Sequence, residues 1–402
     1  MTAKLATGGK KHKLVNVHLL DGSEYITYVD VKSKFQEIFN QVTGHICLRE
    51  TEYFGLAFKK DNEYQFVVLD EKIHKHAPKH WKSGPGEGVD KQGKIIMDVW
   101  FRVQFYVDQV ILLREKVTRH QYYLQLKDNV LEYNHVYSEE KCFQQAAYAL
   151  QADFGNYVEE KHHSGYFHPS VYFPAWILER HGLDYLAHNV PTLHRDLHNM
   201  TKNDAKLCYI RNASMSPGAL NLHFYMVRKH KNDKHCNTWL AICARGVEIY
   251  EDDAGYKSQV STFMWRDIGK LYFDKKKFEI RSVQSAGGRR FIYYTDCDIK
   301  SKYLLSISRS THMFQMAIQP KLMEIQHLDN EDQKRYRESY VSSDPRDRSH
   351  FHHSPSTSTN ASVSSNNQRL SVVSDASSNT TSGIVSDRMT VSLMMEMIIA
   401  ER

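Results

Sequence analysis

A run of three lysines offers the clearest binding chemistry in the sequence. The run falls in the turn between two predicted strands and consists of Lys275, Lys276 and Lys277, with Lys270 close by. Such a turn can present several ammonium groups to the phosphate oxygens of an anionic membrane, each worth about 1 kcal/mol near the surface. The run therefore predicts a lipid-binding site, and a solvated basic hairpin explains it equally well.

Residue types that support catalysis or metal binding do not form a convincing pattern. His194 and His198 are four apart and could share a helix face, but they lack the intervening glutamate of a metalloprotease and an obvious third ligand. The glycine-rich stretch 83–88 lacks the Gly-Lys-Ser/Thr ending of a phosphate-binding loop. A looser histidine cluster has the same interpretation and comprises His74, His76 and His80. We therefore expect no catalytic residues, no metal and no cofactor.

Composition indicates a chain with several folded cores. The 402 residues are 41% hydrophobic and 25% charged, with a formal net charge of +6. This length allows two or three cores and a tail. The six cysteines are scattered without a Cys-x-x-Cys pair, which favours reduced thiols in the cytosol. The mild charge, without basic residues clustered with aromatics on one element, argues against nucleic-acid binding. We expect neither a signal peptide nor a membrane span.

The first region, residues 13–104, has a mixed pattern of strands and one helix. Val15 and Val17 alternate with polar neighbours, and Asp21-Gly22 is a hairpin signal. Asp30 is predicted to cap a helix that Gly44 stops. Further strands are expected at 53–58, 64–69 and 95–103. Two strands, one helix and then more strands is the order of a ubiquitin-like fold.

The second region, residues 105–212, changes to helical spacing. Phe143, Ala146, Ala147 and Leu150 follow a stripe of 3.6 residues, and Gly155 can end that helix. Other helices are predicted from stripes that include Leu126 and Leu131, from 169–181 with Pro174 as a start or a kink, and from 204–211. A small helix bundle fits this region.

The third region, residues 218–326, returns to short strands and ends in a helix. Seven strands are predicted, at 221–227, 239–244, 247–251, 259–264, 271–273, 278–281 and 290–295. The helix carries apolar positions three and four apart, namely Leu304, Ile307, Thr311, Phe314 and Ile318. Seven strands and a closing helix favour a barrel of the pleckstrin-homology or phosphotyrosine-binding type.

The remaining residues, 327–402, read as a disordered tail. Ser, Thr, Asn, Asp and Arg dominate it, so little surface can be buried. Ser349 and Ser371 lie near arginines, where phosphorylation would reverse the local charge. The apolar stretch 391–400 could be a docking peptide or an exposed end.

Motifs in all three folded regions resemble the FERM domain, a three-lobed adaptor of the ezrin, radixin, moesin and band 4.1 superfamily. Leu48–Leu56 is similar to the family's Leu-Arg-Glu-x-x-x-Phe-Gly-Leu stretch. The other matching segments are Tyr123–Leu131, Ala146–Gly155, Val247–Tyr250, Phe263–Ile268 and Lys276–Ile280. The resemblance implies an α+β cloverleaf: a ubiquitin-like lobe, an acyl-CoA-binding-protein-like helix bundle and a pleckstrin-homology-like barrel, followed by the tail.

Within the family, the nearest resemblance is to the Willin and Expanded branch. It rests on His80–Lys82, Tyr172–Trp176, Ile292–Thr295 and Arg335–Tyr340. The branch implies a non-enzymatic scaffold at the cell cortex and junctions, linked to actomyosin organisation and Hippo signalling. The implied partners are cytoplasmic tails of membrane proteins, junctional, polarity or Hippo-pathway proteins, and anionic lipid. The alternative is the FERM portion of a non-receptor tyrosine phosphatase-like protein without its catalytic domain.

The resemblance also implies a groove between the strand 271–273 and the closing helix. FERM domains accept a partner's cytoplasmic tail there as an added strand. The corresponding wall residues in this sequence are Ile268, Leu271, Phe273, Leu304, Ser308 and His312. Burial in the core explains most of the apolar ones without a ligand.

Overall fold

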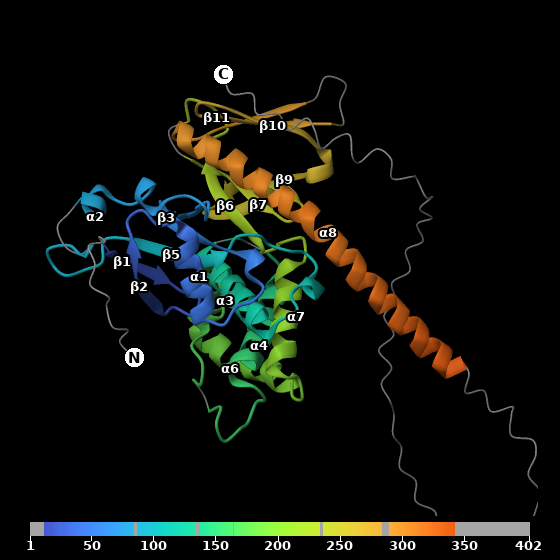
Figure 1. Cartoon of the computed structure of the whole chain (residues 1–402). Helices are drawn as coiled ribbons and strands as arrows, with labels where there is room; N and C mark the ends of the chain where they lie inside the picture. Colours follow the sequence, from blue (N-terminus) through green and yellow to red (C-terminus); the bar gives the residue numbers. More distant parts are fainter. Residues whose placement is uncertain are drawn as a thin grey trace, which may run out of the picture. The chain divides into compact units, whose positions relative to one another are not determined.

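The structure is a computed structural model that describes residues 12–83, 87–133, 135, 137–163, 165–233, 236–283 and 289–341. One compact unit includes every described residue up to Met323, and the described part of a second unit is the helical segment from Glu324 onward. All contacts discussed below lie within the first unit, which contains three lobes (Figure 1). None of its described helices is long and apolar enough to cross a bilayer.

The first lobe is a five-stranded sheet with one long helix. Its strands, in the spatial order β2-β1-β5-β3-β4, are β1 (His12–His18), β2 (Glu24–Asp30), β3 (Phe54–Lys60), β4 (Glu63–Phe66) and β5 (Asp98–Val103). β1 and β5 pair in parallel, and the other neighbours are antiparallel. Helix α1 (Phe35–His45) buries Phe35, Ile38, Phe39 and Val42, which lie three and four residues apart on one face. The short helix α2 (Lys79–Ser83) follows β4.

Two predicted limits of α1 are wrong. The helix is preceded by Lys34, whereas Asp30 ends β2 and its carboxylate accepts a hydrogen bond from the backbone N–H of Lys32. Gly44 lies inside the last turn, and the helix ends at His45. The turn from β2 is longer than the sequence pattern indicated, because the carboxylate of Asp30 bonds locally instead of reaching a helix N-terminus.

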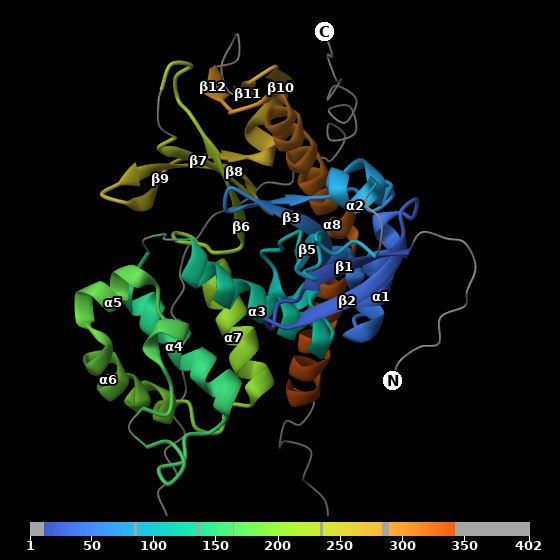
Figure 2. The same ribbon diagram turned by 90° about the vertical axis from the view of Figure 1, so that its left-hand side faces the viewer.

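The central lobe is a bundle of five helices (Figure 2). They are α3 (Lys116–Glu132), α4 (Glu139–Phe154), α5 (Ala175–His181), α6 (Leu183–Asp196) and α7 (Lys202–Ser214). Helix α4 packs against α6 and α7, and its small residues Ala146 and Ala147 are buried where the helices approach. Gly155 ends α4 with a φ of +83°, as predicted.

The central lobe differs from the sequence predictions at three points. Pro174 is the residue before α5, so it starts that helix, and residues 169–171 form a separate 3₁₀ turn. Helix α6 was not predicted, because Pro191 and a high share of polar residues weaken its pattern. Leu131 is 40% exposed on α3 and does not belong to the buried stripe with Leu126.

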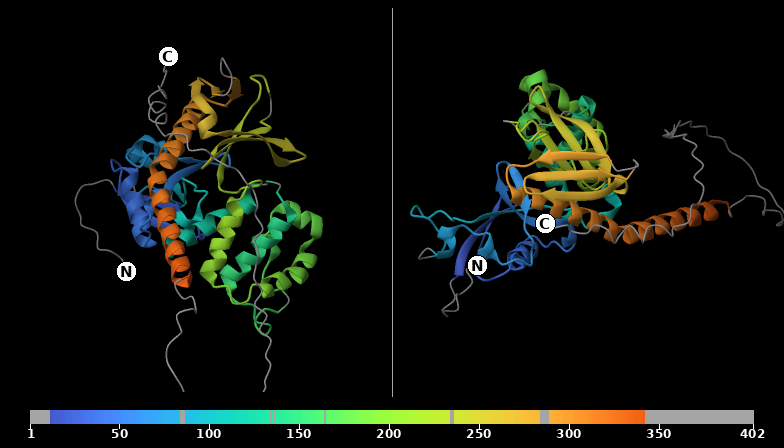
Figure 3. Two further views of the ribbon diagram at one scale, coloured as in Figure 1. Left: turned by 90° about the vertical axis from the view of Figure 1, so that its right-hand side faces the viewer. Right: turned by 90° about the horizontal axis from the view of Figure 1, so that it is seen from above.

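The third lobe consists of two antiparallel sheets and helix α8 (Asp298–Val341). One sheet has the order β6-β7-β8-β9 and the other β10-β11-β12. The strands are β6 (Leu222–Val227), β7 (Thr238–Cys243), β8 (Gly246–Asp253), β9 (Tyr256–Met264), β10 (Ile268–Asp274), β11 (Lys277–Ser282) and β12 (Arg290–Tyr294). All seven predicted strands are therefore confirmed. Leu240, Phe278, Leu304 and Ile307 share one buried core between both sheets and the helix. Figure 3 shows α8, in orange, running beside the strands of this lobe.

Helix α8 is longer than the sequence predicted. The expected tail begins at residue 327, but the helix continues to Val341 and includes Pro320. Its first half also contacts the first lobe: the Tyr303 hydroxyl accepts the backbone N–H of Phe66 at 3.0 Å, and the ring of Phe314 meets that of Tyr53 edge-on, with centroids 5.8 Å apart. These contacts hold the first and third lobes together in one unit.

Candidate functional site

The predicted basic turn connects β10 and β11. Asp274 pairs with Lys277, so Lys275 and Lys276 form a two-residue hairpin turn, and both are exposed. Lys275 has a φ of +51°, the left-handed conformation that such turns require. The backbone carbonyl of Lys276 accepts a hydrogen bond from the N–H of Thr295 at 2.8 Å, which ties the turn to the end of β12.

A buried glutamate, not predicted from the sequence, lies beside this turn. Glu279 has a side chain only 1% exposed, and its carboxylate receives Lys277 Nζ at 2.8 Å and Arg281 Nε at 2.6 Å. Burial acts to raise the pKa of Glu279, but the bonds from Lys277 and Arg281 outweigh it and lower that pKa. Lys277 is thus partly neutralised. Lys270 lies opposite Arg281 in the register, on the same face of the sheet.

The alternation of apolar and charged residues along β11 indicates the ion pairs of Glu279. Phe278 and Ile280 are buried in the core, so the residues between and beside them share the opposite face of the sheet. A single acid between Lys277 and Arg281 on that face is a natural ion-pair centre. Lys275 and Lys276, at the tip of the turn, are exposed and have no ion pair among the described residues.

The predicted peptide groove borders an edge strand. β10 pairs with β11 on one side, and the sheet order leaves its other edge without a strand among the described residues. Leu271, Leu304 and Ser308 are buried, whereas Ile268, Phe273 and His312 are partly exposed. Leu271 and Leu304 therefore belong to the core, which is the alternative explanation given above for the apolar wall residues. The partly exposed residues are the ones a strand added at this edge could contact.

Helix α8 places polar groups beside this edge. The His312 ring stacks on Trp265 with centroids 5.3 Å apart, and burial lowers the pKa of His312. Ser308 is fully buried, and its hydroxyl oxygen has no hydrogen-bond partner among the described residues, which is uncommon for a buried polar atom. The same holds for the hydroxyl of Thr311.

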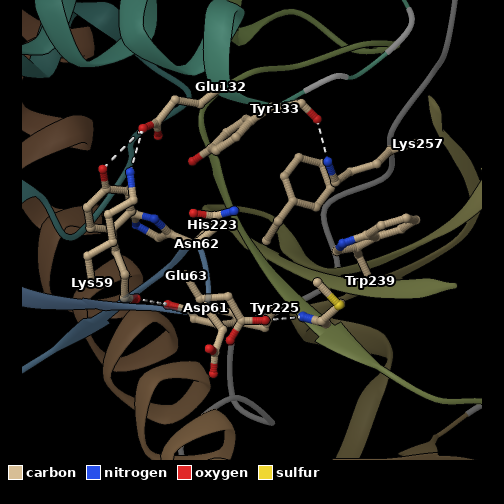
Figure 4. A pocket seen from close by; sticks show the side chains of 13 residues that line it. Lys59, Asp61, Asn62, Glu63, Glu132, Tyr133, His223, Tyr225, Trp239 and Lys257 are labelled. Atoms are coloured by element: carbon tan, nitrogen blue, oxygen red, sulfur yellow. Dashed lines mark hydrogen bonds and ion pairs between the residues drawn. The ribbon is translucent and has the colours of Figure 1, made fainter. Parts of the chain in front are cut away.

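A pocket of about 410 Å³ lies where residues of all three lobes meet (Figure 4). The first lobe contributes the β3–β4 hairpin, the central lobe the end of α3, and the third lobe strands β6, β7 and β9. The lining residues are Lys59, Asp61, Asn62, Glu63, Tyr64, Glu132, Tyr133, His223, Phe224, Tyr225, Met226, Trp239 and Lys257. No local sequence pattern indicates this pocket. Its walls come from segments as far apart as Lys59 and Lys257, which are 198 residues from each other in the chain.

The two histidines considered as metal ligands do not share a helix, because His194 lies in α6 whereas His198 lies beyond its end and is exposed. His194 is fully buried, with Nε2 2.7 Å from the carbonyl oxygen of Gly155 and Nδ1 3.0 Å from the hydroxyl of Tyr166. Both ring nitrogens are therefore occupied, and burial lowers the pKa of His194. Among the described residues, no three His, Cys, Asp or Glu side chains are arranged to hold a metal ion.

Three sequence predictions lie outside the described residues. They are the phosphorylation candidates Ser349 and Ser371 and the apolar stretch 391–400. Part of the glycine-rich stretch, residues 84–86, also lies outside them.

Comparison with protein families gives three consecutive matches. The FERM N-terminal domain matches residues 17–79, the FERM central domain residues 108–225, and the FERM C-terminal PH-like domain residues 232–322. These spans follow the order of the three lobes, with the central match extending into β6 of the third lobe.

Comparison with individual proteins gives relatives much longer than this chain. Tyrosine-protein phosphatase non-receptor type 13 of Mus musculus is 31% identical over 313 residues, which are 77% of this chain and 12% of that protein. Protein expanded of Drosophila melanogaster is 30% identical over 430 residues, covering 90% of this chain and 29% of that protein. The chain thus spans less than a third of either relative.

A solved structure confirms the fold. The FERM domain in the complex of the FERM and C-terminal domains of Drosophila Merlin superposes with a TM-score of 0.62 at 22% identity, over 78% of this chain and 99% of that one. The order of lobes, the family matches and this superposition agree, and the chain belongs to the FERM-domain family.

Proposed function

We propose that this protein is a non-enzymatic adaptor at the membrane cortex, which binds cytoplasmic tails of membrane proteins along the free edge of β10. The observation that carries the proposal is the edge position of β10 beside α8, with Ile268, Phe273 and His312 partly exposed. Backbone groups of an edge strand can pair with an added peptide, and nearby side chains then select its sequence.

The basic turn supports a second contact, with anionic lipid. Lys275 and Lys276 are exposed at the tip, and Lys270 lies in the adjoining edge strand. Lys277 contributes less than the sequence suggested, because its ammonium group is 2.8 Å from the carboxylate of Glu279. Binding both a tail and the lipid around it would hold the protein peripherally at the cytoplasmic face of the plasma membrane.

The likeness to Protein expanded supports the finer part of the proposal. We propose that the protein acts at cell junctions, with junctional, polarity or Hippo-pathway partners and an effect on actomyosin organisation. The likeness to a tyrosine phosphatase supports the alternative, a FERM portion that serves a phosphatase. A search for a longer isoform separates the two, because the alternative expects a form of this protein that carries a phosphatase domain and the adaptor hypothesis does not.

The tail-binding proposal is tested with an array of juxtamembrane peptides from cortical membrane proteins. Phe273→Ser should abolish capture of the peptides that the wild type retains, because Phe273 is on the core-side face of the edge strand. Tyr272→Ser alters the neighbouring residue on the opposite face and should leave capture unchanged. Equal capture by both variants and the wild type would contradict binding at this edge.

The lipid contact is tested with phosphatidylcholine vesicles with and without phosphatidylinositol bisphosphate. Reversing Lys275 and Lys276 to glutamate should remove sedimentation with the anionic vesicles. Reversal of Lys91 and Lys94, an exposed pair in the first lobe, makes the same change in net charge and should have little effect. If both double variants bind like the wild type, the turn does not contact lipid.

A further inference from the structure

The pocket between the three lobes contains two paired carboxylates, Glu63 and Glu132, and two charges without an ion pair among the described residues, Lys257 and Asp61. Glu63 is 2.7 Å from Lys300 Nζ, and Glu132 is 3.1 Å from Lys59 Nζ. Glu132 also accepts the hydroxyl of Tyr64. Both carboxylates are therefore compensated before any ligand enters.

Lys257 is in a different position. Among the described residues, no carboxylate lies within ion-pair distance of its ammonium group. Its Nζ donates to the backbone carbonyl of Tyr133 at the end of α3, and it lies 4.9 Å from the ring centroid of Trp239 and 5.2 Å from that of Phe224. Figure 4 shows Lys257 and Trp239 on one side of the pocket. An ammonium group has three N–H donors, and the Tyr133 carbonyl occupies one of them.

The pKa of Lys257 is consistent with a buried ammonium group that has no carboxylate partner among the described residues. Burial is the main cause that lowers its pKa to about 8, and the more distant Asp252 only partly offsets it. An anion placed at this wall would gain a charge-assisted hydrogen bond in a partly desolvated site. The ring faces of Trp239 and Phe224 beside it provide surface for an apolar neighbour of that anion.

The rim of the pocket limits the kind of ligand. Asp61 and Asn62 form the tip of the β3–β4 hairpin, with φ values of +51° and +61°, and both are exposed. Asp61 disfavours a ligand with several negative charges, such as a phosphorylated headgroup. The amide of Asn62 can both donate to and accept from a peptide backbone. The volume of about 410 Å³ is at the small end of ligand sites, enough for one or two side chains.

We propose that this pocket binds a short acidic segment of a partner protein, which inserts one aspartate or glutamate against Lys257 and an adjacent apolar or aromatic side chain against Trp239 and Phe224. The site is separate from the edge of β10, so a tail bound there and a segment bound here could come from different partners. The pocket between the three lobes would then be a second protein-binding site, in addition to the edge of β10.

The test is a peptide-display selection of random sequences against the wild-type chain and against Lys257→Met. Methionine keeps most of the aliphatic length but removes the charge. Sequences with an acid next to an apolar or aromatic residue should be enriched by the wild type and lost, by at least tenfold, with Lys257→Met. Lys229→Met is the matched control, because Lys229 forms its ion pair with Glu251 elsewhere in the same lobe.

Two further variants separate recognition from a structural role of Lys257 at the end of α3. Lys257→Arg keeps the charge and a donor, so it should restore binding of a selected peptide. Trp239→Leu should weaken binding of the selected peptide. A peptide in which the acidic residue is replaced by its amide should bind weakly to the wild type and to every variant. The proposal is overturned if the selected sequences are the same with Lys257→Met, or if the acidic peptide and its amide form bind the wild type equally.

Discussion

Glu63 and Lys300 form a buried ion pair between two lobes. The carboxylate is on β4 of the first lobe and the ammonium on α8 of the third, 2.7 Å apart, and each side chain is 8% exposed. Glu63 also accepts the backbone N–H of Met226 on β6. One carboxylate thus links the first lobe to a strand and to the helix of the third lobe.

Removing one member of this pair should destabilise the protein strongly. Lys300→Met leaves a buried carboxylate without its cation, and we expect the free energy of unfolding to fall by about 3 to 5 kcal/mol. Burial already raises the pKa of Glu63 although Lys300 opposes it, so the variant should recover stability as the pH falls and Glu63 takes up a proton. Urea unfolding at several pH values measures both effects.

The double variant Glu63→Gln/Lys300→Met is the control for that prediction. It removes both charges, so its cost should be well below the cost of Lys300→Met alone. If the double variant is the less stable of the two, the pair does not hold the lobes as described.

His135 should make the protein less stable in mild acid. The side chain is 3% exposed, and burial, with the nearby charges of Lys257 and Lys141, lowers its pKa to about 4. Below about pH 6.5 the unfolded chain binds a proton that the folded chain does not, so the stability present above that pH is lost as the pH falls toward 4. This one group accounts for a loss on the order of 3 kcal/mol.

The variant His135→Phe isolates that contribution. The ring has aromatic neighbours in Phe224, Tyr250 and Tyr137, and its Nδ1 has no hydrogen-bond partner in the part of the chain that the structure describes, so phenylalanine suits the site. Chemical unfolding between pH 7 and pH 4 should show a smaller decline for the variant (a range set by the ordinary histidine pKa of about 6.5). The same decline in both proteins would show that His135 is protonated when folded.

Gly218 should not tolerate alanine. Its φ is +76°, and an added Cβ would lie 2.4 Å from the Cβ of Tyr137 in the central lobe. The backbone conformation alone costs roughly 1 to 2 kcal/mol, and the collision adds to it. Gly93→Ala is the matched control: its φ is +80° with nothing within 4 Å. Thermal unfolding should rank Gly218→Ala below Gly93→Ala, and equal melting temperatures would argue against this close contact.

Neutralising Glu279 should strengthen binding to anionic vesicles. In Glu279→Gln, Lys277 and Arg281 lose the carboxylate that compensates them, so the face beside the basic turn gains one unit of positive charge. An extra charge near the surface is worth about 1 kcal/mol, or roughly fivefold in affinity. Sedimentation with phosphatidylinositol bisphosphate vesicles measures it. Unchanged or weaker binding by a folded variant would mean that this face does not meet the membrane.

Local pattern was enough to predict most of the elements. The seven strands of the third lobe, the buried stripe of α1 and the end of α4 at Gly155 follow from alternation, helical spacing and glycine, which act over a few residues. The motifs at Leu48–Leu56 and Ala146–Gly155 predicted the family, and the family matches confirm it. Errors occurred where local signals compete, as at Asp30, in the Pro191-containing helix α6 and at the end of α8.

The sequence by itself therefore determined the order of elements, the family and the position of the basic turn. Only the tertiary structure decided which charges are free to bind. Glu279 partly neutralises Lys277, and Lys300, 237 residues away, neutralises Glu63. Lys257 has no carboxylate partner among the described residues. The physical reason is that a charge depends on its neighbours and its burial, and folding brings those together from distant parts of the chain.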